Sequence, residues 1–463
     1  MKVPRRGAGG PADKGRKTAV SEDARQLVHI AFGACALLLR WLTWFEATML
    51  ASMAVAFNLF ALHRLGGARL FRPDERGRYR LKSGIVLYPT AIVGLLLLLP
   101  ERADIVAGAW GVLAAGDGAA TLIGRHAPIL PLPWNRAKSL GGTLAFVVVG
   151  SLAAAALMWW CREAVIPPVY WWYPFAAAVL GTLVAAAVET IPVSFDDNVS
   201  VAGSAALVMW IVSLVSEDLL AMTVAKATEV LPAAVALNAV VAAAGYFVRS
   251  VTVSGAIVGA VLGTAIFVAT GWQGWTLLLA TFGAATTASR VGWRRKTALG
   301  IEESRGGRRG AANAIANTGA AAVAAAMSAL AYGHDAAMVG FAAALTAGGS
   351  DTVASEIGKA LGRRTFLITT RRRVPAGTPG AMSVAGTTAG LIAAAALGSL
   401  AAGLNLIPWS AVAPVVAGAT AGALLESILG ATLEPRGVVN NDILNFINTA
   451  VAAYVAIKVW GLM

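Results

Sequence analysis

The stretch GTLAFVVVGSLAAAALMWW, residues 142–160, decides the fold of this chain. It contains no charged residue and, as a helix, is long enough to cross a hydrocarbon core of roughly 30 Å. Similar apolar runs recur along nearly the whole chain of 463 residues. Charged residues make up only 13% of the sequence, against about 25% in soluble domains. The pattern therefore predicts an all-α, polytopic integral membrane protein.

The apolar runs predict about fifteen transmembrane helices in two fused bundles. They lie near residues 27–45, 47–62, 84–100, 103–122, 142–160, 170–189, 199–215 and 221–247, and near 253–270, 272–289, 311–332, 336–348, 384–403, 408–430 and 443–460. No internal repeat is evident, because the polar motifs of the two halves differ in order and residue type. We expect a basic segment at 1–26, membrane domains at 27–218 and 251–463, and a connecting region at 219–250.

The basic residues predict the orientation of these helices. Most of the 37 lysines and arginines fall in six places, at 1–26, 63–82, 125–138, Arg249, 290–309 and 359–373. Placing all six on the cytoplasmic side satisfies the positive-inside rule. The net charge of +13 thus has a topological explanation, and we expect no nucleic acid partner. We expect the protein in the inner (plasma) membrane of the cell, with its N-terminus and active sites facing the cytoplasm.

Polar residues interrupt the first half where a membrane protein has reason to avoid them. A carboxylate in an apolar helix costs a few kcal/mol or more unless it is paired, metal-bound or facing water. Acids beside a lysine and a hydroxyl are typical of a site for a magnesium-bound polyphosphate. The residues with this pattern are Asp117, Lys138, Ser139, Glu189, Asp196, Asp197 and Asn198. As an alternative, Asp196 and Asp197 are solvated loop acids.

The second half carries a different polar set. We expect Asp351 and Glu356 to be catalytic and to bind metal, because they lie within two helical turns at the end of an apolar run. Hydroxyls, glycines and arginines nearby form a candidate phosphate site: Arg305, Arg308, Arg309, Ser350, Thr352, Ser355, Gly377 and Thr378. Further polar groups within apolar helices are Asn313, Asn317, Glu426, Asn441 and Asn445. As an alternative, the asparagines are interhelical hydrogen-bonding groups worth about 1 kcal/mol per contact.

The motifs of the first half resemble a known family. The ordered blocks GDGAATLIGR, PWNRAKSLGGTLAF and ETIPVSFDDN are similar to those of the membrane-bound phytol and dolichol kinases, over about residues 22–215. The resemblance implies transfer of the terminal phosphate of CTP, or of another nucleotide such as ATP, to a long-chain isoprenoid alcohol. It also implies that the seven polar residues of this half form the nucleotide–metal site, with Asp117, Lys138, Asp196 and Asp197 catalytic and Asp117, Glu189 and Asp196 on the metal.

The second half, over about residues 236–460, resembles another membrane family. Its blocks GIEESRGGRRGAANAIAN, GGSDTVASEIGK, GTPGAMSVAGTTAG and ESILGATLE followed by NNDILNFIN are similar to the family that contains the phytyl-phosphate kinase of tocopherol synthesis. This resemblance implies phosphorylation of an isoprenyl monophosphate to the diphosphate.

Together the two halves predict a bifunctional isoprenoid salvage kinase. The expected cofactors are Mg²⁺ and CTP or another nucleoside triphosphate, and the expected partners are membrane lipids, an isoprenoid alcohol and its phosphate. The alternative is a transporter or flippase of a lipid phosphate, whose substrate path would be lined by the same polar groups.

Overall fold

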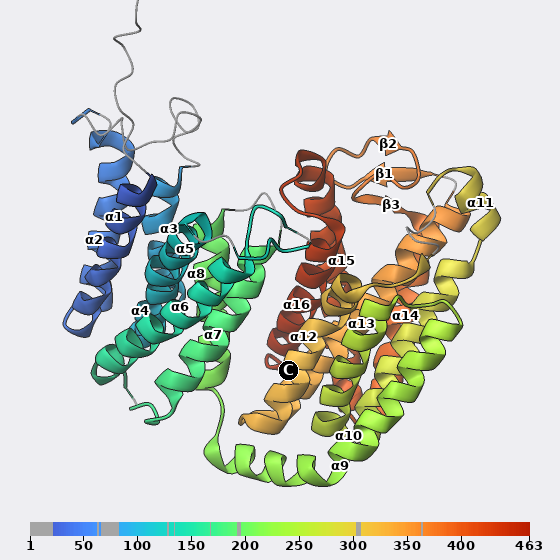
Figure 1. Ribbon diagram of the computed structural model, residues 1–463. Coiled ribbons are helices and arrows are strands. Elements are labelled where there is room, and N and C mark those ends of the chain that lie inside the picture. The colour runs from blue at the N-terminus through green and yellow to red at the C-terminus, as the bar shows by residue number, and fades with distance from the viewer. Residues whose placement is uncertain are drawn as a thin grey trace, which may run out of the picture. The chain divides into compact units, whose positions relative to one another are not determined.

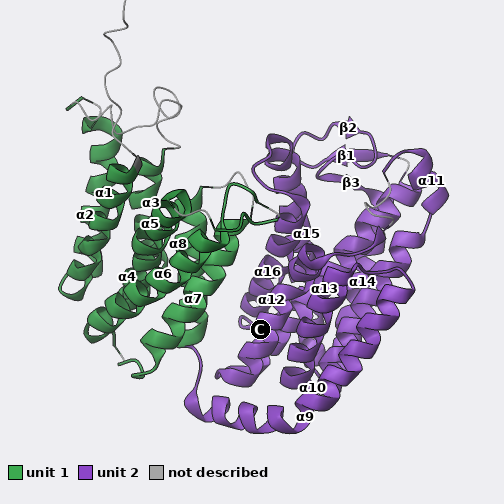
Figure 2. Ribbon diagram, viewed as in Figure 1, with its two compact units in different colours: residues 1–192, 196–213 green, residues 193–195, 214–463 purple. Residues whose placement is uncertain are grey.

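The computed structural model describes residues 22–62, 64–65, 83–126, 129–133, 135–166, 168–191, 196–301, 307–362 and 364–463. Helices dominate these residues (Figure 1), which confirms an all-α integral membrane protein. The described residues form two compact units (Figure 2): unit 1 extends to Ser213, and unit 2 begins at Leu214. Of the basic segment predicted at 1–26, residues 1–21 lie outside the described part of the chain.

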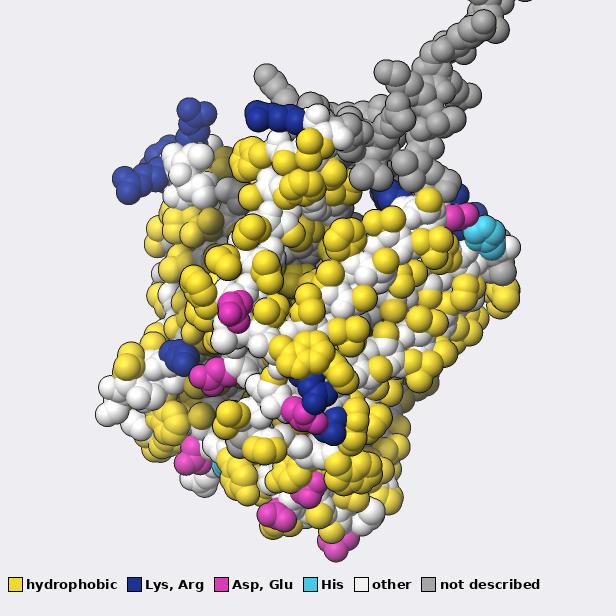
Figure 3. Space-filling view, turned by 90° about the vertical axis from the view of Figure 1, so that its left-hand side faces the viewer, with side chains coloured by type: hydrophobic (Ala, Val, Ile, Leu, Met, Phe, Trp, Pro, Cys, Tyr) yellow, Lys and Arg dark blue, Asp and Glu magenta, His cyan; other side chains and the backbone are white. Residues whose placement is uncertain are grey.

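Apolar helices account for most of the structure. Within the described ranges, ten helical segments are long and apolar enough to cross a membrane, and two shorter apolar helices accompany them. Hydrophobic side chains cover most of the face shown in Figure 3, as expected for a surface that contacts lipid. The predicted number of about fifteen spanning helices is therefore only approximate, whereas the predicted fold class, an all-α membrane protein, is confirmed.

Within the described residues, unit 1 contains eight α-helices, two 3-10 segments and two π-helical turns. The α-helices are α1 (Glu22–Gly33), α2 (Trp44–Ala56), α3 (Gly84–Leu98), α4 (Ala103–Gly111), α5 (Asp117–His126), α6 (Leu140–Cys161), α7 (Tyr173–Thr190) and α8 (Asp197–Ser213). The 3-10 segments are η1 (Ala34–Arg40) and η7 (Arg162–Ala164), and the π-helical turns are η2 (Phe57–Ala61) and η6 (Val112–Gly116).

The core of unit 1 is the continuous helical segment Ala103–His126, which joins α4, η6 and α5. Ile105, Val106 and Leu113 in this segment are fully buried. Helices α6 and α8 pack against α4, and Gly108 allows close contact with the side chain of Met158 in α6. Small residues permit such close helix packing in membranes.

Unit 2 combines eight α-helices with a small sheet. The helices are α9 (Glu217–Phe247), α10 (Val253–Arg290), α11 (Trp293–Ala298), α12 (Ala311–Leu330), α13 (His334–Leu361), α14 (Val384–Gly403), α15 (Val412–Thr432) and α16 (Asn441–Trp460). The strands are β1 (Thr365–Leu367), β2 (Arg373–Val374) and β3 (Ala381–Ser383), in the antiparallel order β2-β1-β3. Short 3-10 turns lie at η9 (Trp409–Ala411) and η10 (Glu434–Arg436).

Helix α13 is the core of unit 2. Every residue from Met338 to Ser350 is buried, and α10, α12, α14, α15 and α16 pack around the helix. A helix that is buried on all sides has no solvated face. The predicted span at 336–348 is therefore only the first part of α13, and the polar stretch from Ser350 to Glu356 continues the same helix.

Two other predicted spans differ from the observed elements. The run at 27–45 divides into α1, the 3-10 segment η1 and the start of α2. The runs at 253–270 and 272–289 are joined in α10, which is kinked at Gly271, whose φ is 74°. Glycine adopts a positive φ readily, so the helix kinks at a residue that tolerates this backbone conformation.

A buried ion pair connects three helices of unit 1. Asp104 in α4 is 0% exposed and accepts hydrogen bonds from Nε and Nη2 of Arg102 at 3.0 and 2.8 Å. The same guanidinium donates to the hydroxyl of Tyr173 in α7 at 2.9 Å. That hydroxyl donates to the carbonyl of Met209 in α8 at 3.1 Å. Removal of the carboxylate would leave a partly buried guanidinium without its counter-charge.

We expect Asp104→Ala to destabilise unit 1 by about 3–5 kcal/mol, since one partner of a buried pair is removed. The measurement is thermal unfolding in detergent, followed by thiol labelling of buried Cys161 in a Cys35→Ser background. The control is Glu163→Ala, which removes the half-exposed partner of Arg40 and should cost at most about 1 kcal/mol. Equal effects of the two substitutions would contradict the structural role of Asp104.

Candidate functional sites

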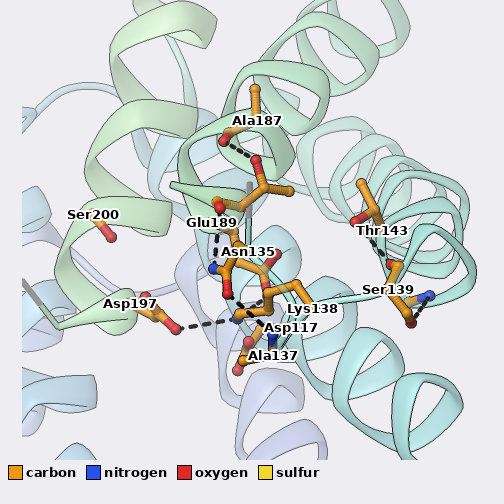
Figure 4. A network of polar contacts seen from close by, with 12 residues as sticks. Asp117, Asn135, Ala137, Lys138, Ser139, Thr143, Ala187, Glu189, Asp197 and Ser200 are labelled. Atoms are coloured by element: carbon orange, nitrogen blue, oxygen red, sulfur yellow. Dashed lines mark hydrogen bonds and ion pairs between the residues drawn. The ribbon is translucent and has the colours of Figure 1, made fainter. Parts of the chain in front are cut away.

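Lys138 is the centre of the polar cluster in unit 1 (Figure 4). Its Nζ forms an ion pair with Glu189 at the end of α7 and lies 3.5 Å from Oδ2 of Asp197 at the start of α8. Glu189 is only 5% exposed. Burial lowers the pKa of Lys138, but the negative charges of Glu189 and Asp197 raise it further, so the net shift is upward. Lys138 therefore stays protonated and holds two carboxylates close together.

Asp117 lies beside Lys138 (Figure 4), at the point where the π-helical turn η6 passes into α5. Its Oδ2 is 3.9 Å from Nε2 of His29 in α1, and its charge also acts on Lys138. Single π-helical turns occur frequently at functional sites. Asp117, Glu189 and Asp197 thus bring three carboxylates around one lysine.

Other predicted residues of unit 1 position the ends of its helices. The Oγ of Ser139 accepts a hydrogen bond from the backbone N–H of Gly142 at 3.2 Å and caps α6. The Oδ1 of Asp196 accepts from the backbone and side-chain nitrogens of Asn198 at 3.0 and 2.7 Å. Asn135 donates to a carbonyl oxygen at the end of α7 at 3.1 Å. These hydrogen bonds fix the helix ends and the loop that carry Lys138 and its partners.

Unit 2 contains a polar cavity of about 300 Å³, a volume at the lower end of small-molecule sites. It lies among α13, α14, α15, α16 and the segment that precedes β3. Most residues predicted for this half line the cavity: Arg309, Asn313, Ser350, Asp351, Thr352, Ser355, Glu356, Gly377, Thr378, Glu426, Asn441 and Asn445. Arg308 and Asn317 are not among its lining residues, and Arg305 lies outside the described residues.

The partner of Asp351 is Glu426. The side chains of Asp351 in α13 and Glu426 in α15 hydrogen-bond to one another. Asn448 in α16 donates from Nδ2 to Oε2 of Glu426 at 2.7 Å. Two carboxylates in direct contact repel each other unless they share a proton or a cation. The pair is therefore the strongest candidate in unit 2 for binding a divalent cation.

Glu356, which the sequence analysis paired with Asp351, has other partners. Its Oε2 accepts a hydrogen bond from Nζ of Lys296 at 2.5 Å, and its Oε1 accepts from Nζ of Lys359 at 2.8 Å. Lys296 is 0% exposed and Glu356 is 1% exposed. Side chains share a helix face at spacings of three or four residues, and Asp351 and Glu356 are five apart. The same rule predicts Lys359, three residues on, as a partner of Glu356. Lys296 is far from Glu356 in sequence, so no helical spacing predicts that contact.

The small sheet, which the sequence analysis missed, brings a glycine loop to the cavity. The loop lies between β2 and β3 and contains Gly377 and Gly380, both with positive φ. A Cβ on Gly380 would lie 2.3 Å from the carbonyl oxygen of Ser427 in α15. Only glycine permits this approach, so the loop closes directly against the helix that carries Glu426.

The two polar clusters repeat one motif, contrary to the expectation of no internal repeat. GDGAATLIGR at 116–125 aligns without gaps with SDTVASEIGK at 350–359, and Asp117 then matches Asp351. Alanine, isoleucine and glycine also coincide, and a basic residue ends both stretches. Each stretch belongs to the buried core helix of its unit. Four identical residues in ten aligned positions, together with the shared place in the core helix, indicate two copies of one structural element.

The next helix repeats the same contacts in both units. Ser139 accepts from the N–H of Gly142 at 3.2 Å, and Ser383 accepts from the N–H of Gly386 at 3.1 Å. A Cβ on either glycine would lie within 3.0 Å of a carbonyl oxygen of the Asp-bearing helix. A β-bridge joins Ser139 to Pro131 in unit 1, and Ser383 pairs with β1 in the same way in unit 2.

The last two helices of each unit complete the repeat. Glu189 is close to the C-terminal end of α7 and Glu426 to that of α15. Eight residues before each glutamate is a glycine, Gly181 or Gly418, packed on the following helix. A Cβ on these glycines would lie 3.1 and 2.4 Å from carbonyl oxygens of α8 and α16. Asp117 with Glu189 therefore corresponds to Asp351 with Glu426.

The two sites differ in their basic residues. Lys138 directly precedes the capping serine of unit 1, whereas Met382 holds the matching position in unit 2. In unit 2 the cations near the cavity are Lys359 and Arg309. Among the described residues, no group of three or more His, Cys, Asp or Glu side chains is arranged to hold a metal ion. Mg²⁺ usually takes only one or two carboxylates together with water and phosphate oxygens, so the acidic pairs fit it.

Comparison with known proteins identifies the family. The family described as integral membrane protein DUF92 matches residues 236–453. An uncharacterized membrane protein of Synechocystis sp. is 40% identical over 204 residues, which cover 43% of this chain and 78% of that protein. Protein VTE6, chloroplastic, of Arabidopsis thaliana is 38% identical over 45% of this chain and 65% of its own length.

A second group of relatives carries kinase names. The probable phytol kinase 3, chloroplastic, of Glycine max is 29% identical over 190 residues, which cover 38% of this chain and 59% of that protein. No solved structure matches the chain. The resemblances stated from the motifs are thereby confirmed, and the chain belongs to the DUF92 family of integral membrane proteins, with additional similarity to the phytol kinases of plants.

Proposed function

We propose that the protein phosphorylates an isoprenoid alcohol in unit 1 and the resulting monophosphate in unit 2, with a magnesium-bound nucleoside triphosphate, CTP or another such as ATP, as donor. The observation that carries this proposal is the repeated Asp–Ser–Gly–Glu arrangement, because two similar sites in one chain suit two successive transfers of the same group. The name of the soybean relative, a probable phytol kinase, supports an isoprenoid alcohol as the first acceptor.

In the first step, the hydroxyl oxygen of the alcohol forms a bond to the γ-phosphorus. The bond from that phosphorus to the bridging oxygen breaks, and its electron pair leaves on the nucleoside diphosphate. The hydroxyl proton passes to a carboxylate, for which Asp117 is placed beside Lys138. Lys138 neutralises phosphate oxygens as a point charge. Phosphoryl transfer depends mainly on such positioning and charge neutralisation, which this cluster of unit 1 provides.

In the second step, an oxygen of the monophosphate forms the new bond to the γ-phosphorus, and the nucleoside diphosphate again leaves with the electron pair. This acceptor is already anionic, so it needs cations around it more than a base. Arg309 and Lys359 line the cavity of unit 2. The pair of Asp351 and Glu426 would hold the magnesium ion, which neutralises β- and γ-phosphate oxygens when bound.

The repeat also bears on the alternative of a transporter. Transporters built from repeats bind their substrate at the interface between the repeats. Here each unit has its own polar cluster, and the cavity of unit 2 is lined by residues of that unit alone. A separate polar cluster in each unit suits two successive reactions better than a single transport path for one substrate.

The proposal predicts that single substitutions separate the two steps. With purified protein, magnesium, CTP or ATP, and geranylgeraniol, the wild type should form the diphosphate. Asp351→Asn should accumulate monophosphate, and Asp117→Asn should form no product from the alcohol yet convert added monophosphate. The first step should slow roughly 100-fold or more in Asp117→Asn, the scale of a lost acid–base group. The second step should slow roughly 10- to 100-fold or more in Asp351→Asn, the scale of a perturbed metal site. Radiolabelled products resolved by chromatography provide the measurement.

Asp335→Asn is the matched control, because Asp335 is an exposed acid on the first turn of the same helix α13. It should leave both rates unchanged. If the wild type forms no nucleotide-dependent product from several alcohols and monophosphates, the kinase proposal is wrong and a transporter takes its place.

A second prediction concerns the metal of unit 2. Glu426→Gln should raise the magnesium concentration that gives half-maximal diphosphate formation by roughly 10-fold or more, since one of two ligand charges is lost. Glu356→Gln should mainly lower the melting temperature, because buried Lys296 loses its counter-charge. Magnesium titrations, with manganese binding followed by electron paramagnetic resonance, test both. An unchanged metal affinity in Glu426→Gln would show that the acidic pair holds a proton instead.

A further inference from the structure

Unit 2 contains a second pocket, of about 130 Å³, between α9, α10 and α12. Its walls are mostly apolar and include Val241 of α9 and Leu278, Leu279 and Phe282 of α10. Hydrophobic residues on the outer side of α10, such as Ile257, are exposed, as expected where a helix meets lipid. The pocket thus lies among helices that border the hydrocarbon phase.

This apolar pocket adjoins the polar cavity of the proposed second reaction. Arg309 and Asn313 line both spaces. Arg309 precedes α12, and its guanidinium lies 5.6 Å from the ring centroid of Phe282 in the apolar wall. One charged side chain therefore stands at the border between an apolar space and a polar one. A molecule that fits both must carry an anionic group and an apolar chain.

An isoprenoid monophosphate has this shape. Its phosphate must reach the polar cavity to receive a phosphoryl group, and its chain gains about 25 cal/mol for each Å² of apolar surface removed from water. The wall of the polar cavity mixes apolar residues, such as Leu391 and Leu424, with the hydroxyls, amides and charged groups near Asp351, whereas the wall of the second pocket is predominantly apolar. The pocket between α9, α10 and α12 therefore suits an apolar chain better than the cavity does.

We propose that this pocket, which we name the chain pocket, binds the apolar chain of the monophosphate accepted by unit 2, with the phosphate at Arg309 and Asn313. The inference rests on the proposed function of unit 2 and adds the position of its acceptor. The chain pocket holds the part of the chain nearest the phosphate, and the remainder extends into the bilayer. Its open side lets the substrate enter from the membrane.

Gly259 of α10 allows a direct test. It lines the chain pocket, and a Cβ on it would meet no atom within 4 Å. Gly259→Leu therefore adds a side chain at the wall of the chain pocket, with open space around its Cβ. The KM for geranylgeranyl monophosphate should rise roughly 10-fold or more, the scale of a lost fit in a hydrophobic pocket. The kcat/KM for ethyl monophosphate, which has no chain to place there, should not change.

Gly283→Leu is the matched control. Gly283 lies on the same helix, is also exposed, and would likewise carry a Cβ with no atom within 4 Å, but it does not line the chain pocket. It should leave both acceptors unaffected. Equal effects of the two leucine substitutions, or an equal loss for the long and short acceptors with Gly259→Leu, would overturn the inference and indicate that bilayer lipid fills the pocket.

A measurement that does not depend on turnover separates this inference from the proposed function. A geranylgeranyl monophosphate analogue with a diazirine in its first isoprene unit should label peptides of α9 and α10 in the wild type, and Gly259→Leu should abolish the labelling. Excess phosphatidylcholine should not compete. Labelling elsewhere, or competition by phospholipid, contradicts the chain pocket, whereas absence of diphosphate product in the wild type contradicts the kinase proposal alone.

Discussion

The close contact between each core helix and the glycine that follows a capping serine sets the position of every polar group in the two clusters. A Cβ on Gly142 or Gly386 would lie 3.0 or 2.5 Å from a backbone carbonyl oxygen of the preceding helix, closer than an ordinary van der Waals contact. The serine before each of them satisfies the first N–H groups of the new helix, as an N-cap must when water is scarce. Because both helix ends are fixed in this way, the aspartate beside them is held inside the protein and away from lipid.

That contact also explains how two different sequences form the same arrangement of helices and polar residues. Matching residues are those whose size or hydrogen bonds the backbone arrangement requires: the aspartate, the glycines, the serine and the glutamate. Divergent residues include the one directly before the capping serine, which is Lys138 in unit 1 and Met382 in unit 2. An uncharged alcohol and an anionic monophosphate place different demands on the surrounding charge, whereas a common donor places the same demand. The pattern of similarity and divergence is the one expected under the proposed function, with two acceptors and one donor.

Sequence reasoning succeeded where a single local rule applies. Apolar runs predict membrane helices because a bilayer admits few other structures, and the cost of a charge in lipid singled out Asp117 and Asp351. It failed where partners are distant in sequence, since Asp351 and Glu426 are joined only by the packing of α13 on α15. The repeat could have been predicted from the sequence, because its ten aligned positions are contiguous in both units. The expectation of no repeat followed from the surrounding polar residues, which differ between the copies, as Lys138 and Met382 do.

The placement of the two clusters within a membrane protein has one more consequence. A twenty-carbon chain loses about 0.8 kcal/mol of stabilisation for each methylene exposed to water, roughly 16 kcal/mol in all. Under the proposed function, a monophosphate released from the first site would therefore stay in the bilayer, and diffusion in two dimensions would carry it to the second. Transfer between the sites requires only a shared membrane, together with a route by which a chain can slide sideways between helices. Fusion of the two units in one chain would then supply equal amounts of both proposed activities in the same membrane, which would keep an amphiphilic intermediate from accumulating.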